Sequence, residues 1–442
     1  MALVYFLSLG CDKNLTDSEA MLGLLAKAGH RFTEDASQAE VIVVNTCSFI
    51  GDAKEESIDA ILEMAAYKEN GRCRALLAAG CLAERYQKEI LQELPELDGV
   101  LGTSAYEHIA EAVEEALKKP AAPLRYYNNL SYLPLVRERI LTTGGHYAYL
   151  KIAEGCDKYC SYCAIPFVRG PYRSLPLEEV VEQARRLVEG GVKELILVAQ
   201  ETTLYGTDLY GSKKLPELLR RLEEIEGLVW IRLLYGYPEE ITEELIEAMA
   251  SSDKICHYLD LPIQHAADTV LARMGRRTNR REVTALIGRL REKMPDLALR
   301  TPLIAGFPGE TEEEHEENLR FIREIAFDRL GVFSYSREEG TAAYKMKGQV
   351  PKKTRERRRR ELMLAQQEVA FAKARAMKGR QLKVMVEGYM PEEGVCVGRS
   401  YMDAPEVDGL VFFPDAGLKE SGDFAEIRVS GARDYDLLGE VL

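Results

Sequence analysis

The chain has 442 residues, too many for one ordinary hydrophobic core, so its length predicts two or three domains. Apolar residues make up 46% and charged residues 29%, the composition of a soluble globular protein. The absence of a membrane-length apolar stretch or a signal-peptide pattern predicts a cytoplasmic protein with no membrane partner. The net charge of −14 argues against a general nucleic-acid binder, because neutralising phosphates requires a basic surface.

The first part of the chain, residues 1–117, alternates strand-length apolar runs with helical patterns. The expected strands are 3–9, 39–44 and 74–79. The first helix is expected to begin at an N-cap formed by Thr16 or Asp17, because short polar residues favour that position. Alternating strands and helices of this kind predict a parallel sheet covered on both faces. Residues 118–141 show no period and are expected to form a linker.

The strand–helix alternation resumes in residues 142–376 and repeats about six times. The expected strands are 147–153, 194–199, 229–235, 258–263, 299–304 and 330–335, with helices such as 177–190 and 311–326 between them. Six units fall short of the eight of a complete barrel, so we expect a partial barrel. A charged helix is expected over 351–378.

The last part, residues 378–442, has short β-rich segments and frequent glycine, which predict a small antiparallel barrel. The expected fold class is therefore α/β, with a parallel-sheet domain (1–117), a partial (β/α) barrel (142–376) and a small β-barrel (378–442).

Three cysteines in one loop form the most specific motif of the chain. Cys156, Cys160 and Cys163 lie in EGCDKYCSYCAIP, directly after a predicted strand. Three thiolates in one loop suit an iron–sulfur cluster that leaves one iron open to a cofactor. A zinc knuckle or a redox-active thiol pair is the alternative, although no fourth Cys or His follows nearby.

A second set of cysteines is dispersed along the chain. Cys11, Cys47 and Cys81 each follow a predicted strand by one or two residues. The carboxyl ends of parallel strands lie at one edge of a sheet, so the three sulfurs can converge there. The alternative is three unrelated buried thiols. The other three cysteines, Cys73, Cys256 and Cys396, have no partner at metal spacing, and we expect them to be structural.

The loop EGCDKYCSYCAIP resembles the radical S-adenosylmethionine superfamily. The resemblance implies that Cys156, Cys160 and Cys163 hold a catalytic [4Fe–4S] cluster, and that Tyr162 lies against the adenine of S-adenosylmethionine. The stretch VAQETTLYG, with Gln200 and Glu201, resembles the segment that contacts the amino end of this cofactor.

The segments SLGCDKNLTDSE, NTCSFIGDAKEES and AAGCLAERY resemble the N-terminal domain of the methylthiotransferases. That resemblance implies a second, auxiliary [4Fe–4S] cluster on Cys11, Cys47 and Cys81. Asn14 and Asn45 fit the family pattern as positioning residues rather than ligands. Asp12 departs from the pattern, where proline is expected, without affecting the cysteine. A reductant of flavodoxin or ferredoxin type is the expected electron donor.

Three further residues lie in predicted strands or at their ends. Gln264 is a candidate cofactor-binding residue, and the neighbouring His265 is either a proton carrier or a structural residue. Arg300 is a candidate for the cofactor carboxylate, because a guanidinium group matches that shape. The basic block 352–360, in which seven of nine residues are Lys or Arg, either binds RNA or is a solvated helix face.

The methylthiotransferase family has two substrate branches, one modifying tRNA adenosine and the other the β-carbon of an aspartate in the small-subunit ribosomal protein numbered twelve. SLGCDKN, AQETTLYG and SYMDAPEVDG resemble the second branch. Residues 380–442, which resemble a TRAM domain, carry six basic and thirteen acidic residues, a balance of −7. Such a surface should attract a basic ribosomal protein and repel tRNA. The alternatives are the tRNA-modifying branch and a non-catalytic protein that binds zinc and RNA.

Overall fold

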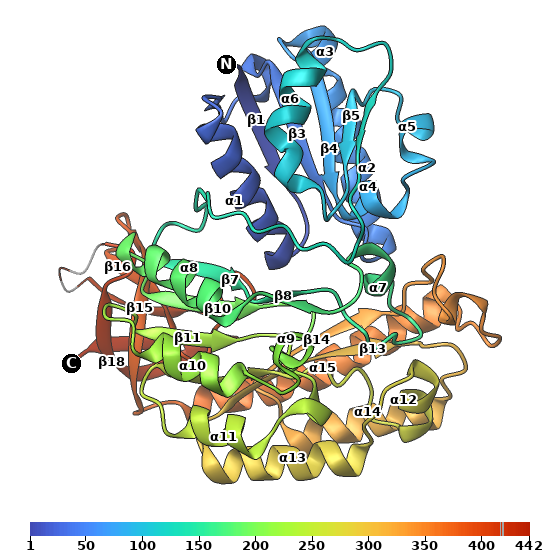
Figure 1. Cartoon of the computed structure of the whole chain (residues 1–442). Coiled ribbons are helices and arrows are strands. Elements are labelled where there is room, and N and C mark those ends of the chain that lie inside the picture. The colour runs from blue at the N-terminus through green and yellow to red at the C-terminus, as the bar shows by residue number, and fades with distance from the viewer. Residues whose placement is uncertain (416, 418–419) are drawn as a thin grey trace. The chain divides into compact units, whose positions relative to one another are not determined.

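A computed structural model describes residues 1–415, 417 and 420–442 (Figure 1). Lys419, one of the basic residues in the balance of −7, lies outside the described residues. The chain divides into two compact units. Unit 1 comprises residues 1–142, 153–174 and 336–344, and unit 2 comprises residues 143–152, 175–335 and 345–442. The loop of Cys156 therefore belongs to the same unit as the N-terminal region. In the described part of the chain, every helix is too short or too polar to span a bilayer.

Unit 1 is built on a six-stranded sheet in which every pairing is parallel, as predicted. In spatial order its strands are β2 (Arg31–Phe32), β1 (Leu3–Ser8), β3 (Val41–Thr46), β4 (Ala75–Gly80), β5 (Gly99–Leu101) and β6 (Leu124–Tyr126). Its helices are α1 (Asp12–Lys27), α2 (Gly51–Ala65), α3 (Tyr67–Asn70), α4 (Cys81–Arg85), α5 (Ile90–Glu93), α6 (Ile109–Leu117) and α7 (Ile165–Val168). The sheet has three strands more than expected: the short strands β2 and β5 were not predicted, and β6 forms within the segment that was expected to be a linker.

Side chains of β3 alternate between two hydrophobic cores. Val41 and Val43 pack with residues of α1 and α6, whereas Ile42 and Val44 pack with residues of α2. Both faces of the sheet are thus covered by helices. A strand buried on both faces needs a continuous apolar sequence, and β3 supplies one.

Helix α1 begins at Asp12, with Cys11 as its N-cap, so the expected cap at Thr16 or Asp17 is wrong. Thr16 donates a hydrogen bond of 2.7 Å to the backbone carbonyl of Lys13, inside the first turns. The Asp17 carboxylate is buried and bonds Arg169 rather than the helix terminus. Cys11 therefore lies at the junction of β1 and α1.

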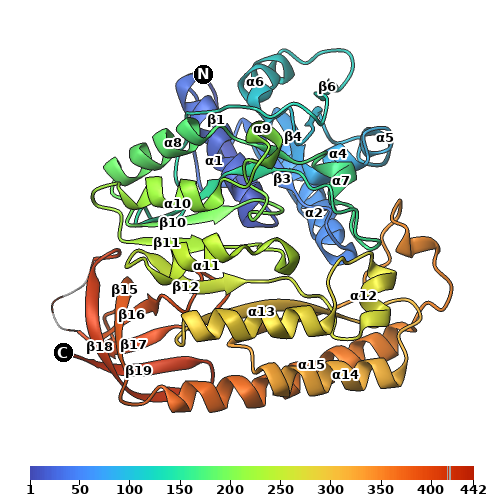
Figure 2. The same ribbon diagram turned by 60° about the horizontal axis from the view of Figure 1, so that its bottom comes forward.

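Unit 2 contains the six parallel strands that the sequence predicts for a partial barrel. In spatial order they are β14 (Arg329–Ser334), β13 (Ala298–Ala305), β12 (Ile255–Asp260), β11 (Trp230–Leu233), β10 (Glu194–Val198) and β7 (Tyr147–Lys151). The helices are α8 (Leu177–Glu189), α9 (Thr207–Tyr210), α10 (Leu215–Glu223), α11 (Glu243–Ala250), α12 (Asp268–Met274), α13 (Arg280–Lys293), α14 (Glu312–Ile325) and α15 (Lys352–Ala376). Figure 2 shows α10, α11 and α13 along one side of these strands.

The C-terminal segment forms a closed five-stranded barrel. Its strands, in order around the barrel, are β15 (Gln381–Met390), β16 (Val395–Ser400), β17 (Val411–Pro414), β19 (Asp436–Val441) and β18 (Phe424–Arg433). The expected antiparallel arrangement holds for all neighbours except β17 and β19, which pair in parallel.

Buried charges join this C-terminal barrel to the beginnings of the parallel strands. Glu194, the first residue of β10, accepts hydrogen bonds of 2.7 Å from Arg232 of β11 and from Arg399 of β16. All three side chains are almost completely buried. The aromatic rings of Trp230 and Phe424 meet edge to face beside them. The C-terminal barrel therefore rests on the N-terminal ends of the strands (Figure 2).

The segment SYMDAPEVDG, expected to mark the substrate branch, lies in this same contact. Asp403 forms an ion pair with Arg329, the first residue of β14. Asp408 accepts a hydrogen bond of 2.7 Å from Tyr258 and lies 3.8 Å from the guanidinium of Arg300. Asp403 is 1% exposed, so the expectation that the acids of the tail form an outward surface is wrong for this residue.

Removing the shared carboxylate should destabilise unit 2. Glu194→Gln leaves Arg232 and Arg399 buried without their counter-charge, a change that costs roughly 3–5 kcal/mol. We expect a clearly lower melting temperature in calorimetry of the full chain. Glu217→Gln is the matched control, because Glu217 forms an exposed pair with Lys214 and such pairs contribute little. Equal melting temperatures for the two variants would contradict this account of the contact.

Candidate functional site

The structure brings Cys11, Cys47 and Cys81 to one edge of the sheet in unit 1. They follow β1, β3 and β4, which are neighbours in the sheet. The register pairs Ser8 with Asn45 and Thr46 with Gly80, so the three strands end at the same level. Three chain segments far apart in sequence therefore present one cysteine each at a common edge.

Two asparagines hold this edge together through the backbone. The Asn14 amide donates hydrogen bonds to the carbonyls of Leu9 (2.6 Å) and Thr46 (3.2 Å). The Asn45 amide donates to the carbonyl of Asn14 at 2.9 Å and to Ser18 at 2.8 Å. Both are buried, and both contact the segments that carry the cysteines. This geometry suits positioning residues.

Sequence reasoning missed two glycines that permit the close approach. Gly10 and Gly80 directly precede Cys11 and Cys81, and their φ angles are +91° and +90°. A Cβ atom at Gly10 would lie 2.8 Å from the Cβ of Cys47, and one at Gly80 would lie 2.3 Å from Oδ1 of Asn45. The repeated Gly–Cys dipeptide is the signal that could have revealed them.

The three thiols share an electrostatic environment. Burial raises the pKa of Cys81 to about 12; Arg169 opposes this rise, whereas nearby Cys47 and Cys11 add to it. Burial is also the main cause that raises the pKa of Cys47. The Cys47 and Cys81 thiols would therefore be protonated without metal at neutral pH, so loading a thiolate-bound metal centre would release protons.

Cys11, Cys47 and Cys81 suit a metal cluster better than a single metal ion. Among the described residues, no three Cys, His, Asp or Glu side chains are grouped closely enough to ligate a single metal ion. A cluster with iron at several corners accepts thiolates that lie further apart, and three cysteines leave one iron open. The three strand ends and the tight glycines fit such a cluster.

Arg169 is a further residue that sequence reasoning missed. Its buried guanidinium donates hydrogen bonds to Asp17 (2.6 Å), Glu154 (3.2 Å), Asn14 (3.0 Å) and the sulfur of Cys81 (3.4 Å). The charges of Cys81, Glu154 and Asp17 overcome the effect of burial and raise its pKa above the usual value. A fixed positive charge therefore lies against one of the sulfurs.

The second cysteine set lies in the same unit, in the loop between β8 (Ala153–Glu154) and β9 (Arg173–Ser174). These two short strands pair antiparallel and close the base of the loop. Gly155, at φ +81°, leaves no room for a Cβ, which would lie 2.1 Å from the carbonyl oxygen of Pro171. Cys156 and Cys160 are buried, whereas Cys163 and Tyr162 are half-buried. All six cysteines of the two sets therefore belong to unit 1.

The other predicted cofactor residues lie in unit 2. Gln200 and Glu201 follow β10, and Glu201 is completely buried and accepts a hydrogen bond from the backbone of Thr203. Gln264 follows β12 with a left-handed φ of +78°, and its backbone bonds Pro302 and Ile304 of β13. These residues lie beyond the carboxyl ends of parallel strands, the usual place of chemistry in such barrels.

Arg300 has partners of another kind. Its guanidinium lies 3.3 Å from Asp260 and 3.8 Å from Asp408, a residue of the C-terminal barrel. Two carboxylates already balance this charge within unit 2. Arg300 is therefore not among the residues proposed to bind the cofactor.

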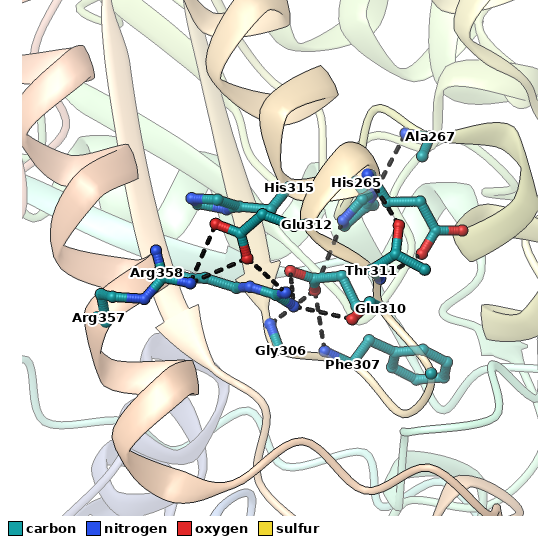
Figure 3. Close-up of polar contacts among 12 residues, drawn as sticks. His265, Ala267, Gly306, Phe307, Glu310, Thr311, Glu312, His315, Arg357 and Arg358 are labelled. Atoms are coloured by element: carbon teal, nitrogen blue, oxygen red, sulfur yellow. Dashed lines mark hydrogen bonds and ion pairs between the residues drawn. The ribbon is translucent and has the colours of Figure 1, made fainter.

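His265 belongs to a buried polar network (Figure 3). Its Nδ1 accepts a hydrogen bond of 3.0 Å from the backbone of Ala267, and its Nε2 lies 3.6 Å from Glu310. Glu310 also accepts hydrogen bonds from the backbone of Gly306 (2.6 Å) and Phe307 (3.0 Å). Burial raises the pKa of Glu310, but His265 and Arg358 hold it below its usual value. This network supports the structural interpretation of His265, which fixes the turn after β13.

Part of the basic block 352–360 also forms ion pairs with the network around His265 and Glu310. Arg358 is buried and bonds Glu310 at 3.0 Å, and it shares Glu312 with the exposed Arg357 (Figure 3). Arg357 also pairs with Glu361 at 3.0 Å. Lys352 lies 3.9 Å from Glu356, so three of the seven basic residues form internal ion pairs, which supports the helix-face interpretation for them.

Three family models match successive parts of the chain. Residues 3–102 match "Uncharacterized protein family UPF0004", residues 150–322 match "Radical SAM superfamily", and residues 379–442 match "TRAM domain".

Curated relatives match along the entire chain. A protein of Lachnoclostridium phytofermentans named "Ribosomal protein uS12 methylthiotransferase RimO" is 56% identical over 437 residues, which cover 99% of each chain. Proteins with the same name from Acetivibrio thermocellus and Geobacter sulfurreducens are 50% and 49% identical, again over 99% of this chain and 98% of theirs.

Solved structures with low sequence identity share the fold. The radical S-adenosylmethionine methyltransferase TsrM from Kitasatospora setae matches with a TM-score of 0.57 and 13% identity, over 77% of this chain and 76% of that one. OxsB, a cobalamin-dependent S-adenosylmethionine radical enzyme, matches with a TM-score of 0.52 and 12% identity, over 78% of this chain and 54% of that one.

The glycine before Cys81 provides a test of this geometry. Gly80→Ala should lower both the melting temperature and the iron retained after anaerobic reconstitution, because the new Cβ would collide with Asn45 and Thr46. Gly29→Ala is the matched control, since its φ of +85° imposes a similar backbone strain, of roughly 1 kcal/mol, with no atom within 4 Å. If both variants lose the same stability and iron, the close packing at this edge is unimportant.

Proposed function

The chain belongs to the family of ribosomal protein uS12 methylthiotransferases, and we propose that it attaches a methylthio group to the β-carbon of an aspartate in uS12. It is a radical S-adenosylmethionine enzyme and an S-adenosylmethionine-dependent transferase. The family implies S-adenosylmethionine and a [4Fe–4S] cluster as cofactors. The structural observation that supports the finer proposal is the presence of two separate sets of three cysteines within unit 1.

We assign one [4Fe–4S] cluster to each set. The loop set, Cys156, Cys160 and Cys163, would hold the cluster that supplies an electron to S-adenosylmethionine, and the N-terminal set would hold the auxiliary cluster that supplies sulfur. The protein itself provides the thiolates, the tight turns at the preceding glycines and the burial that limits water around four of the six sulfurs.

The proposed reaction balances in atoms and electrons when sulfur enters as sulfide. A C–H bond of the aspartate breaks and a C–S bond forms. One S-adenosylmethionine gives its methyl group to the sulfur and leaves as S-adenosylhomocysteine. A second one takes up one electron and the substrate hydrogen and leaves as methionine and 5′-deoxyadenosine, and the electron returns when the C–S bond forms. A radical route suits sulfur at the sulfide level, because a carbanion at this carbon would not form a bond with a nucleophilic sulfur.

We propose Gln200, Glu201 and Gln264 of unit 2 as cofactor-binding residues, and for Tyr162 of unit 1 we propose, from the resemblance alone, a contact with the adenine. The first three follow strands at their carboxyl ends, where a barrel of this kind binds ligands, and Tyr162 directly precedes Cys163. The polar groups of Gln200, Glu201 and Gln264 can orient the amino acid end of S-adenosylmethionine. A reductant of flavodoxin or ferredoxin type would supply the initial electron, and a ribosomal substrate places the enzyme in the cytoplasm.

The described surface of the C-terminal barrel supports a basic protein as substrate. Seven of its acids are exposed, against four basic residues: Glu392, Glu393, Glu406, Glu420, Glu426, Asp434 and Glu440, against Arg380, Lys383, Arg428 and Arg433. An acidic surface attracts a basic partner and repels a phosphate backbone. This charge favours uS12 over tRNA, the substrate of the other branch.

Replacing the N-terminal cysteines should separate cofactor cleavage from sulfur insertion. With Cys11, Cys47 and Cys81 all changed to Ala, we expect about half of the iron, continued formation of 5′-deoxyadenosine with dithionite, and no methylthio product. The matched variant, with Cys156, Cys160 and Cys163 changed to Ala, should also keep about half of the iron but form no 5′-deoxyadenosine. Methylthio product from the first variant, or complete loss of iron from either one, would refute two independent clusters.

Reversing exposed acids of the C-terminal barrel should weaken substrate binding. We choose Glu392, Glu393 and Glu406 for change to Lys and leave the buried Asp403 intact. Binding to uS12 should weaken mainly through a slower association, and the loss should shrink as salt rises, because screening acts over about 8 Å at physiological ionic strength.

The matched control for this reversal changes Glu189, Glu292 and Glu316 to Lys, which alters the net charge equally at exposed positions outside the C-terminal barrel. Both variants should cleave S-adenosylmethionine normally. Equal affinity of the two variants for uS12 would show that the position of the acids is irrelevant. Tighter binding of tRNA than of uS12 by the unsubstituted enzyme would favour the tRNA branch.

A further inference from the structure

One side chain in unit 1 connects the surroundings of both cysteine sets. Arg169 follows the loop of Cys163 and is only 2% exposed. Its partners Asn14 and Asp17 lie in α1, directly after Cys11. Another partner, Glu154, lies two residues before Cys156.

The ion pairs fix the direction of the guanidinium. Nη1 donates hydrogen bonds to Asp17 at 2.6 Å and to Glu154 at 3.2 Å. Nη2 donates to Asn14 at 3.0 Å and to the sulfur of Cys81 at 3.4 Å. Because the group is planar and its Nη1 is held by two carboxylates, Nη2 is directed at Asn14 and at the sulfur without needing to reorganise. Salt screens this buried charge much less than an exposed one.

We propose that Arg169 sets the reduction potential of the auxiliary cluster through its hydrogen bond to Cys81. This inference depends on the proposed function, which assigns that cluster to Cys11, Cys47 and Cys81. Hydrogen bonds to the cysteine sulfurs and nearby positive charge stabilise the reduced form of an iron–sulfur cluster and so raise its potential. Arg169 is thus a tuning residue that acts through a ligand and does not touch the substrate.

The carboxylates beside Arg169 predict the direction in which its replacement shifts the reduction potential. Arg169→Gln would leave Asp17 and Glu154 near the cluster without a counter-charge. Both the lost cation and the remaining anions disfavour an added electron, so the potential should move to more negative values. Arg169→Lys keeps a charge but offers no planar fork, and its shift should be smaller in the same direction.

The experiment isolates the auxiliary cluster within the full chain. Cys156, Cys160 and Cys163 are changed to Ala, so that only the N-terminal set can hold iron, and the protein is reconstituted anaerobically. The readout is a potentiometric titration followed by electron paramagnetic resonance, with iron and sulfide counts on every variant. Arg139→Gln is the matched control, because Arg139 also forms an ion pair with a buried acid of unit 1, Glu19, at 2.7 Å.

We expect a negative shift for Arg169→Gln, a smaller one for Arg169→Lys, and the unchanged potential for Arg139→Gln. A potential for Arg169→Gln that matches the unsubstituted background would overturn the inference. If Arg169→Gln retains no iron, the Lys variant decides, and an unchanged potential there overturns the inference equally. Absence of iron from the background itself would defeat the two-cluster proposal, so failure of that proposal is distinguishable from failure of this one.

Discussion

The parallel sheet of unit 1 is the constraint on which the proposed chemistry depends. Three neighbouring strands end at one level, and each is followed within three residues by a cysteine. The register of the sheet thereby brings distant cysteines to one edge, since Cys11 and Cys81 lie 70 positions apart in the sequence. The glycines at φ near +90° and the asparagine bonds to backbone carbonyls hold this edge in place. A buried arginine then places a positive charge beside one of the sulfurs.

Charges in unit 2 serve a different purpose. Glu194, Arg232 and Arg399 form a buried cluster where the C-terminal barrel meets the beginnings of the strands. These ion pairs connect segments about 200 positions apart, and removing one partner would leave an uncompensated buried charge. The opposite, carboxyl ends of the strands carry Gln200, Glu201 and Gln264. Structural and proposed cofactor-binding residues are thus separated along the same strands.

The sequence predicted most of the fold but less of the site. Strand runs such as 41–44 are apolar throughout and predicted a buried parallel sheet, and the repeated strand–helix pattern predicted six parallel strands in unit 2. The positions of the cysteines in the sequence predicted both sets of three. Local patterns could not reveal that the Cys156 loop groups with the N-terminal sheet, or that Asp403 faces inward to Arg329, because both depend on contacts distant in sequence. Arg169 was missed for the same reason, since an isolated arginine carries no local sign of its partners.

The central claim is that this enzyme modifies uS12 and leaves tRNA unmodified. Mass spectrometry of uS12 peptides and of tRNA nucleosides, from cells with and without the gene, tests it most directly. The account predicts that deletion removes a methylthio group from an aspartate of uS12, that re-expression restores it, and that the methylthiolated adenosine content of tRNA does not change. An unaltered uS12, or loss of methylthiolated adenosine from tRNA, would contradict it.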